Sequence, residues 1–165
     1  MPSVLTRALA LLALAVLASC GGGGPDCCSP PPSGSGSFTA SVTGAKSASL
    51  TGQAGYVTGA NTFSIALRDG SSASTYIQLS HLGAVLPAAG TYSLDPNGDP
   101  AHAFGVIFSG GGTENYAGTG GTLTLTTVSG TTFRGDFTFT AKGGSSGSAT
   151  VNVSGHFEAT PLTAP

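Results

Sequence analysis

The chain has few charged side chains and no cluster of basic ones. Asp, Glu, Lys and Arg make up 7% of its 165 residues. After residue 19, four of the five Lys and Arg residues remain against seven Asp and Glu, which gives a formal charge of −3 (4 − 7). Proteins that bind nucleic acid present a basic patch or stripe to the phosphates. The composition therefore argues against nucleic acid as a partner.

Helical periodicity is also missing. Tryptophan is absent, and no window after residue 20 repeats apolar residues at the spacing of an amphipathic helix. Apolar residues alternate instead with Thr and Ser, a period of two that is typical of half-buried strands. In residues 133–140, for example, every second residue is Phe or Gly. With residues 122–126 and 151–158, this stretch predicts a three-stranded antiparallel meander with one apolar face.

Similar alternation recurs from Phe38 onward and indicates about eight to ten short strands. A lone sheet would leave its apolar face in water, so we expect an all-β antiparallel sandwich or a flattened, partly open barrel. Residues 48–58 are interpreted as a strand interrupted near two glycines. The glycine-rich stretches 110–112 and 118–121 are interpreted as flexible loops, because no Gly-Lys-Ser/Thr motif or helix follows them.

Cysteine is scarce: the three cysteines are Cys20, Cys27 and Cys28, all before the first strand signal. A disulfide between Cys27 and Cys28 would be strained, since adjacent Cα atoms lie about 3.8 Å apart and disulfides prefer about 4.4 to 6.8 Å. Structural zinc needs about four ligands, which this segment does not supply. Two interpretations remain open for Cys27 and Cys28: linker thiols without a defined role, or a bridge to a second molecule.

The amino terminus has the order of a secretory signal peptide. Arg7 precedes an apolar run, residues 8–18, that is shorter than the roughly 20 residues a spanning helix needs. The run ends in Leu-Ala-Ser-Cys at Cys20, which resembles the lipobox of bacterial lipoproteins. That resemblance implies cleavage before Cys20, acyl chains on Cys20 and anchoring in the cell envelope. Because Gly21 rather than Asp follows, it also implies the outer membrane if the source is Gram-negative.

This pattern divides the chain into four parts. Residues 1–19 form the signal peptide, and residues 20–37 comprise the lipidated cysteine and a linker rich in Gly, Ser and Pro. Residues 38–160 form the β domain, and residues 161–165 form a tail. We expect the linker to act as a tether between the membrane and the domain.

The end of the β domain carries a second resemblance. The stretches GTLTLTTVSGTTFRGDFTFTAK and GSATVNVSGHFEA resemble the closing strands of small uncharacterised bacterial lipoprotein domains. The resemblance implies a β fold and an envelope location. It implies no activity, cofactor or catalytic residue.

Two sets of residues contain side chains that can bind metal ions. Asp95 begins the stretch DPNGD, which starts like a calcium loop, but Pro100 and Val106 stand where that loop needs Gly and Glu. A plain turn is the favoured interpretation. His81, His102 and His156 have no second ligand at a suitable spacing, so the sequence predicts neither a metal site nor a cofactor.

Catalysis is not indicated either. Asp136 and Glu158 are expected on the solvent face of neighbouring strands, where a pair of carboxylates would suit glycoside hydrolysis. Arg134 beside them favours an ordinary surface ion pair. No motif assembles a nucleophile, a base and a stabilising group, so we expect no enzyme activity.

The sequence predicts a lipid-anchored, non-catalytic β domain that serves envelope structure, assembly or recognition of a partner. Strand faces rich in Thr, Ser and Asn would offer hydrogen bonds to an envelope protein or a glycan. The alternative is a lipocalin-like carrier of a small apolar ligand, which requires an apolar cavity of about 300 Å³ or more. Nothing in the sequence indicates the oligomeric state.

Overall fold

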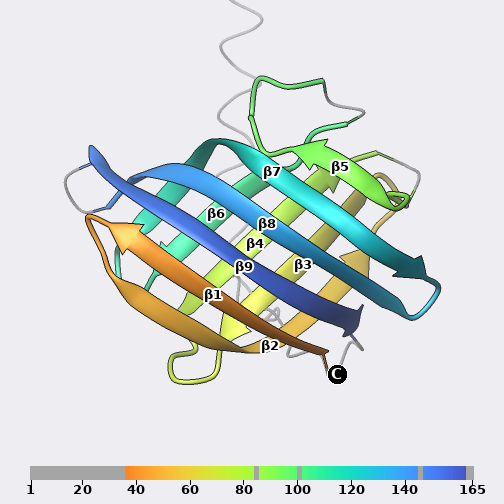
Figure 1. The fold of residues 1–165 in the computed structure, drawn as a ribbon, viewed down its shortest axis with the longest axis horizontal. Helices are drawn as coiled ribbons and strands as arrows, with labels where there is room; N and C mark the ends of the chain where they lie inside the picture. The colour runs from red at the N-terminus through yellow and green to blue at the C-terminus, as the bar shows by residue number, and fades with distance from the viewer. Residues whose placement is uncertain (1–35, 84–85, 100–101, 145–146, 163–165) are drawn as a thin grey trace, which may run out of the picture.

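The computed structural model describes residues 36–83, 86–99, 102–144 and 147–162. Cys20, Cys27 and Cys28 lie outside the described residues. Nine strands form one sheet in the described part (Figure 1). They are β1 (Gly36–Gly44), β2 (Ala48–Thr58), β3 (Thr62–Asp69), β4 (Thr75–Leu82), β5 (Gly90–Ser93), β6 (Gly105–Gly110), β7 (Asn115–Ser129), β8 (Thr132–Gly143) and β9 (Ala149–Pro161).

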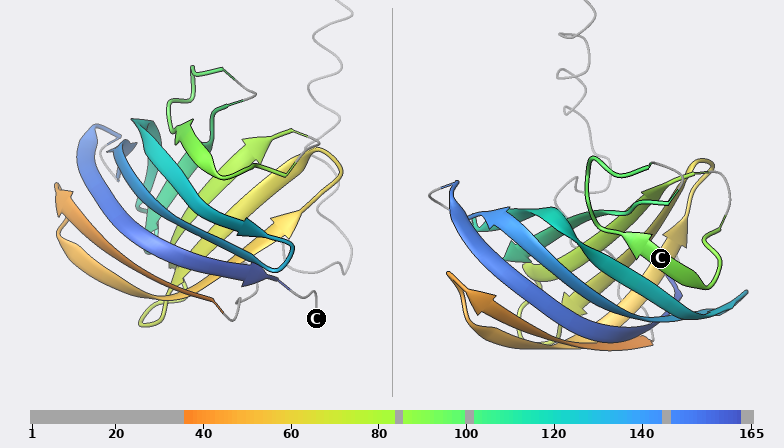
Figure 2. Two further views of the ribbon diagram at one scale, coloured as in Figure 1. Left: turned by 45° about the vertical axis from the view of Figure 1, so that its right-hand side comes forward. Right: turned by 45° about the horizontal axis from the view of Figure 1, so that its top comes forward.

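Eight of these strands close into a barrel. Their order is β7, β6, β4, β3, β2, β1, β9 and β8, and pairing of β8 with β7 closes the ring. The long strand β7 pairs with β8 along almost its whole length, while its other edge pairs first with β6 and then with the extra strand β5. Two further views show the strands wrapping around a common interior (Figure 2).

The all-β antiparallel class predicted from the sequence is confirmed, and so is the meander of β7, β8 and β9. The architecture is a closed barrel rather than a sandwich or a partly open barrel. Neighbouring strands pair antiparallel throughout, apart from a short parallel contact of β2 with β9. In an open sheet, the backbone N–H and C=O groups of the edge strands would be exposed to water. Closure pairs these groups with each other.

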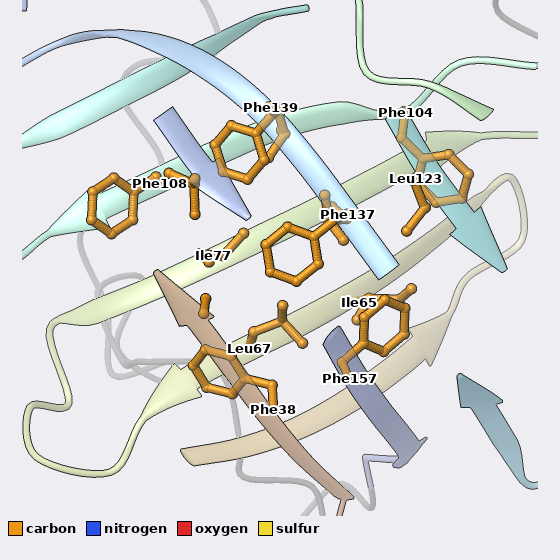
Figure 3. Packing of buried hydrophobic residues seen from close by; sticks show 14 of the residues in the cluster. Phe38, Ile65, Leu67, Ile77, Phe104, Phe108, Leu123, Phe137, Phe139 and Phe157 are labelled. Carbon is orange, nitrogen blue, oxygen red and sulfur yellow. The ribbon is translucent and has the colours of Figure 1, made fainter. Parts of the chain in front are cut away.

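The interior of the barrel is filled with side chains. Phenylalanines from opposite walls meet there with Ile and Leu from β3 and β4 (Figure 3). The largest side chains with less than 2% of their surface exposed are Phe63, Phe104, Phe108, Phe133, Phe139, Ile65, Leu67, Ile77, Leu79, Leu94, Leu123 and Leu125. Because less than 2% of the surface of these side chains is exposed, a water molecule does not fit beside them. The part of the core that they line is therefore packed without water-sized gaps.

One buried tyrosine ties two parts of the barrel together. The ring of Tyr56, on β2, packs edge-on against Phe133 of β8 at 4.7 Å between ring centres. Its hydroxyl donates a hydrogen bond to the carbonyl of Gly130 in the β7–β8 turn, at 3.0 Å. Burial raises the pKa of the Tyr56 hydroxyl, because the interior disfavours the charged phenolate. The hydroxyl thus stays neutral and keeps its bond.

Two expectations about glycine were wrong. Strand β2 runs without interruption through Gly52, and residues 118–121 lie within β7 rather than in a loop. A Cβ on Gly118 would stand 2.0 Å from the Val106 side chain, so only glycine admits so close a neighbour. The register also shifts between Gly118 and Gly120, which marks a bulge in β7.

The alternation of β8 predicts how neighbouring substitutions affect stability. Phe139 is 1% exposed in the core, whereas Thr138 faces solvent. Phe139→Ala should lower the free energy of unfolding by about 3 to 5 kcal/mol, because it leaves a cavity. Thr138→Ala should change it by no more than about 0.5 kcal/mol. Chemical denaturation of both variants checks this, and equal losses would show that β8 faces the other way.

Candidate functional site: a trough on the outer wall

The outer wall of the barrel has a shallow hollow of about 620 Å³ lined by residues of β2, β1, β9, β8 and β7. These five strands are neighbours in the barrel (Figure 1). Its floor is one row of paired residues. Leu50 pairs with Ala40, Ala40 with Gly155, and Gly155 with Phe137. The hollow therefore runs across the strands rather than along them.

Two rows of polar residues form the rims of this hollow, one on each side of the floor. The first rim consists of Thr51, Thr39, His156, Asp136 and Thr124, and the second consists of Ser49, Ser41, Ser154, Thr138 and Thr122. We call the hollow with its two rims the trough. Strands lie about 4.8 Å apart, so five strands give a trough about 19 Å long. The rims are two residues apart along each strand, or about 7 Å.

Small residues lie in the middle of the floor. Gly155 has no side chain, and its neighbour in the register, Ala40, has only a methyl group. A Cβ on Gly155 would stand 2.3 Å from the carbonyl oxygen of Thr39 and 2.8 Å from the ring of Phe137. The strands on both sides therefore occupy the space that a side chain would fill. This close approach depends on glycine.

Most hydroxyl groups of the trough have no partner within the described part of the chain. Exceptions are Thr39, whose hydroxyl lies 3.3 Å from both ring nitrogens of His156, and Thr124, which lies 3.4 Å from the Thr91 hydroxyl. The groups that form no hydrogen bond with another described residue are the hydroxyls of Ser41, Ser49, Thr51, Thr122, Thr138 and Ser154 and the carboxylate of Asp136. These groups are accessible to a molecule that binds from outside.

Two pairs of polar residues just beyond the rims are bonded to each other. On one side, the Thr140 hydroxyl donates to the Asn152 side-chain oxygen at 2.9 Å. On the other, Arg134 donates to the carboxylate of Glu158 at 2.8 Å, and this bond and the charge of Glu158 raise the pKa of Arg134. The surface ion pair predicted for Arg134 is confirmed. The unpaired hydroxyls of the trough thus lie between two pairs of bonded polar side chains.

The trough is nearly neutral. Asp136 is the one charged residue among those that line it, and His156 is the one other titratable residue. No lysine or arginine lines it. A negatively charged polymer would therefore meet a carboxylate and no lysine or arginine among the residues that line the trough.

Thr39, His156 and Asp136 follow one another across three strands, and they are the residue types of a hydrolytic triad. Their geometry does not fit that role. Both ring nitrogens of His156 are equally far from the Thr39 hydroxyl, so the hydroxyl lies beside the ring rather than on a nitrogen lone pair. Among the described residues, Asp136 has no hydrogen bond to orient His156, so the three groups form no activated nucleophile.

The other histidines lie elsewhere. His81, at the end of β4, is 5% exposed; its Nδ1 lies 2.9 Å from the Ala103 carbonyl oxygen, and its ring stacks on Phe104 at 5.0 Å. His102 pairs with Asp99 at 2.9 Å. Within the described ranges, the structure brings together no group of three His, Cys, Asp or Glu residues suited to a metal ion.

The stretch that begins at Asp95 forms the predicted turn. The Asp95 side chain accepts a hydrogen bond from the Asn97 backbone N–H at 2.9 Å, and the Asp95 carbonyl accepts one from the Gly98 N–H at 2.9 Å. Aspartate in such turns bonds to the backbone two residues ahead without any ion. The turn belongs to the connection between β5 and β6.

A second hollow, of about 340 Å³, lies between the end of β4 and the connection from β5 to β6. We call it the side pocket. Its lining is mostly apolar and comprises Ser80, Leu82, Asp95, Pro96, Gly98, Ala103, Phe104 and Gly105. Leu82 is the most exposed of the large apolar residues described, at 71%.

Comparison with protein-family models, with curated proteins and with solved structures found no match to this chain. The site is therefore defined by its own geometry. Alternating Thr and Ser on the solvent face was visible in the sequence. Its grouping into two rims was not, because that depends on the pairing of β1 with β9, which are far apart in the chain.

The floor of the trough yields a prediction about stability. Gly155→Ala should destabilise the barrel by about 1 to 3 kcal/mol, because the new methyl group would collide with the Thr39 carbonyl and the Phe137 ring. Gly130→Ala is the matched control, since a Cβ there meets no atom within 4 Å. Denaturation midpoints of the two variants check the difference. A Gly155→Ala protein as stable as the Gly130→Ala protein would refute the close approach that hollows the wall.

Proposed function

We propose that the protein is a lipid-anchored, non-catalytic barrel that recognises a partner in the cell envelope through the trough. The observation that carries this proposal is the alignment, along two parallel rims, of hydroxyl groups that have no partner among the described residues. Some polar side chains beyond the rims are paired instead, such as Arg134 with Glu158 and Thr140 with Asn152. Unpaired groups on a fixed sheet form a preorganised set of donors and acceptors, which limits the entropy lost on binding.

Binding is favoured over catalysis by the contents of the trough. Glycoside hydrolysis by the common mechanism needs two carboxyl groups about 5 to 9.5 Å apart. Asp136 is the one carboxylate among the lining residues, and Glu158 is engaged with Arg134 beyond the rim. In the middle strands, backbone N–H groups are also used by the sheet, so they do not form an oxyanion hole.

The proposed anchor is Cys20. Strand β1 begins at Gly36, 16 residues later (36 − 20). A flexible tether of that length spans about 20 to 25 Å, which would hold the barrel close to the membrane surface without burying it. In the described residues, no helix has the length and apolar character needed to cross a bilayer. The outer membrane is the proposed location if the source is Gram-negative, since Gly21 follows Cys20.

Mass spectrometry of the protein isolated from its own cells tests the anchor. We expect an amino-terminal peptide that begins at Cys20 and carries the added mass of acyl chains. More than one long chain gives stable attachment, because each buried CH₂ contributes about 0.8 kcal/mol. Cys20→Ala should abolish this modified peptide. A mature terminus at another residue, or an unmodified Cys20, would refute the lipoprotein assignment.

A carrier of small apolar ligands is the second candidate, and the side pocket is the observation that favours it. At about 340 Å³ and with a mainly apolar lining, the side pocket has the size of a small-molecule site. It lies outside the filled interior, however, and its rim residue Leu82 is open to solvent. Lipocalin-like carriers instead hold their ligand inside the barrel.

Fluorescence titration with a neutral apolar dye distinguishes the two functions. We expect no saturable binding, because the interior is filled and the side pocket is open to water. Leu82→Glu would remove a carrier site, while Val57→Glu is the matched control at another exposed apolar residue, on β2. Saturable binding that is lost in Leu82→Glu and retained in Val57→Glu would establish the carrier function.

A further inference from the structure

We propose that the trough binds a neutral, unbranched polysaccharide whose chain lies across the strands between the two rims. This inference rests on the proposed function of the trough as a recognition surface. It names the chemical class of the partner from the shape, the charge and the hydrogen-bonding groups of the site.

The shape of the trough fits a linear chain. It is about 19 Å long and about 7 Å between rims, and both rims carry polar groups over the full length. A compact ligand would contact only part of it. An extended chain on the small residues Ala40 and Gly155 would reach hydroxyl groups on both sides at once.

The charge of the trough disfavours anionic polymers. Acidic polysaccharides and nucleic acids are held by lysine and arginine, which bond to carboxylate, sulfate or phosphate groups. Asp136 is the one charged lining residue, and its carboxylate would repel such groups. A neutral chain avoids this repulsion, and its hydroxyls donate to the carboxylate.

The side chains of the trough are also unlike those that anchor a protein partner. Binding energy between proteins is concentrated in buried Trp, Tyr and Arg residues that fill pockets. None of these residue types lines the trough, and its one phenyl ring, that of Phe137, is 3% exposed. A peptide would find neither an aromatic anchor nor an apolar pocket there.

The hydrogen-bonding groups match those of a sugar chain. Each Ser or Thr hydroxyl both donates and accepts, as each sugar hydroxyl does. Ser41, Ser154 and Thr138 stand on adjacent strands in one rim, so their spacing repeats at about 4.8 Å. A polymer with hydroxyls along its length would contact several of these groups in succession. Each bond adds little, so we expect dissociation constants between about 10 μM and 1 mM.

Calorimetric titration of the full chain tests this proposal, in a detergent without a sugar head group. The probes are neutral hexasaccharides: β-1,4- and α-1,4-linked glucose, β-1,4-linked mannose and β-1,4-linked N-acetylglucosamine. We expect at least one of them to bind. The trough variant, Thr138→Val with Ser154→Ala, should weaken that binding at least tenfold, because it removes two neighbouring hydroxyls.

The control variant is Thr127→Val with Ser37→Ala, which makes the same chemical changes at exposed positions of β7 and β1 outside the trough. It should bind as the unaltered protein does. Melting curves of both variants should match that of the unaltered protein, since all four residues are exposed or lie on the outer face. Weaker binding in the trough variant alone would support the proposal.

Three results would overturn it. Failure of every neutral hexasaccharide to bind below about 1 mM would refute the ligand class. Binding of an acidic hexasaccharide or an extended peptide, but of no neutral one, would also refute the ligand class while leaving the trough as a recognition site. Equal binding by the trough variant and the control variant would place the sugar elsewhere and would refute the trough as the site.

Discussion

Pairing of β7 with β8 is the interaction on which the rest of the structure depends. It joins the two ends of the row of eight strands, which would otherwise form an open, curved sheet. Closure makes the solvent face of β7 continuous with those of β8, β9, β1 and β2, and these five strands carry the trough. It also encloses the phenylalanines of β8 in the core, where burial of their apolar surface stabilises the fold.

The alternation that fills the interior also builds the exterior. Each strand directs one residue inward and the next outward, so a dense apolar core implies rows of solvent-facing residues at fixed spacing. In this protein the outward residues on five strands are mainly Thr and Ser. The floor between the two rims is low because its residues, among them Ala40 and Phe137, direct their side chains into the core. One pattern of residues thus determines both the core and the proposed recognition surface.

Local features of the fold were readable in the sequence, and long-range features were not. The alternation in residues 133–140 correctly placed Phe137 and Phe139 in the core, because period two is a property of the strand itself. The sheet closes because β7 pairs with both β6 and β8. The sequence predicts a loop at residues 118–121 of β7, so this pairing does not follow from the sequence. The trough could not be predicted without this knowledge, because its lining comes from segments far apart in the chain.

The central claim is that recognition takes place in the trough. The most direct measurement is a nuclear magnetic resonance titration of the isotope-labelled full chain with the neutral hexasaccharide that binds most tightly. The account predicts that the largest shifts of backbone amide signals cluster at Ser41, Thr138 and Ser154 and their neighbours in the rims. Shifts centred on Leu82 and Ala103, at the side pocket, or spread evenly over the barrel would contradict it.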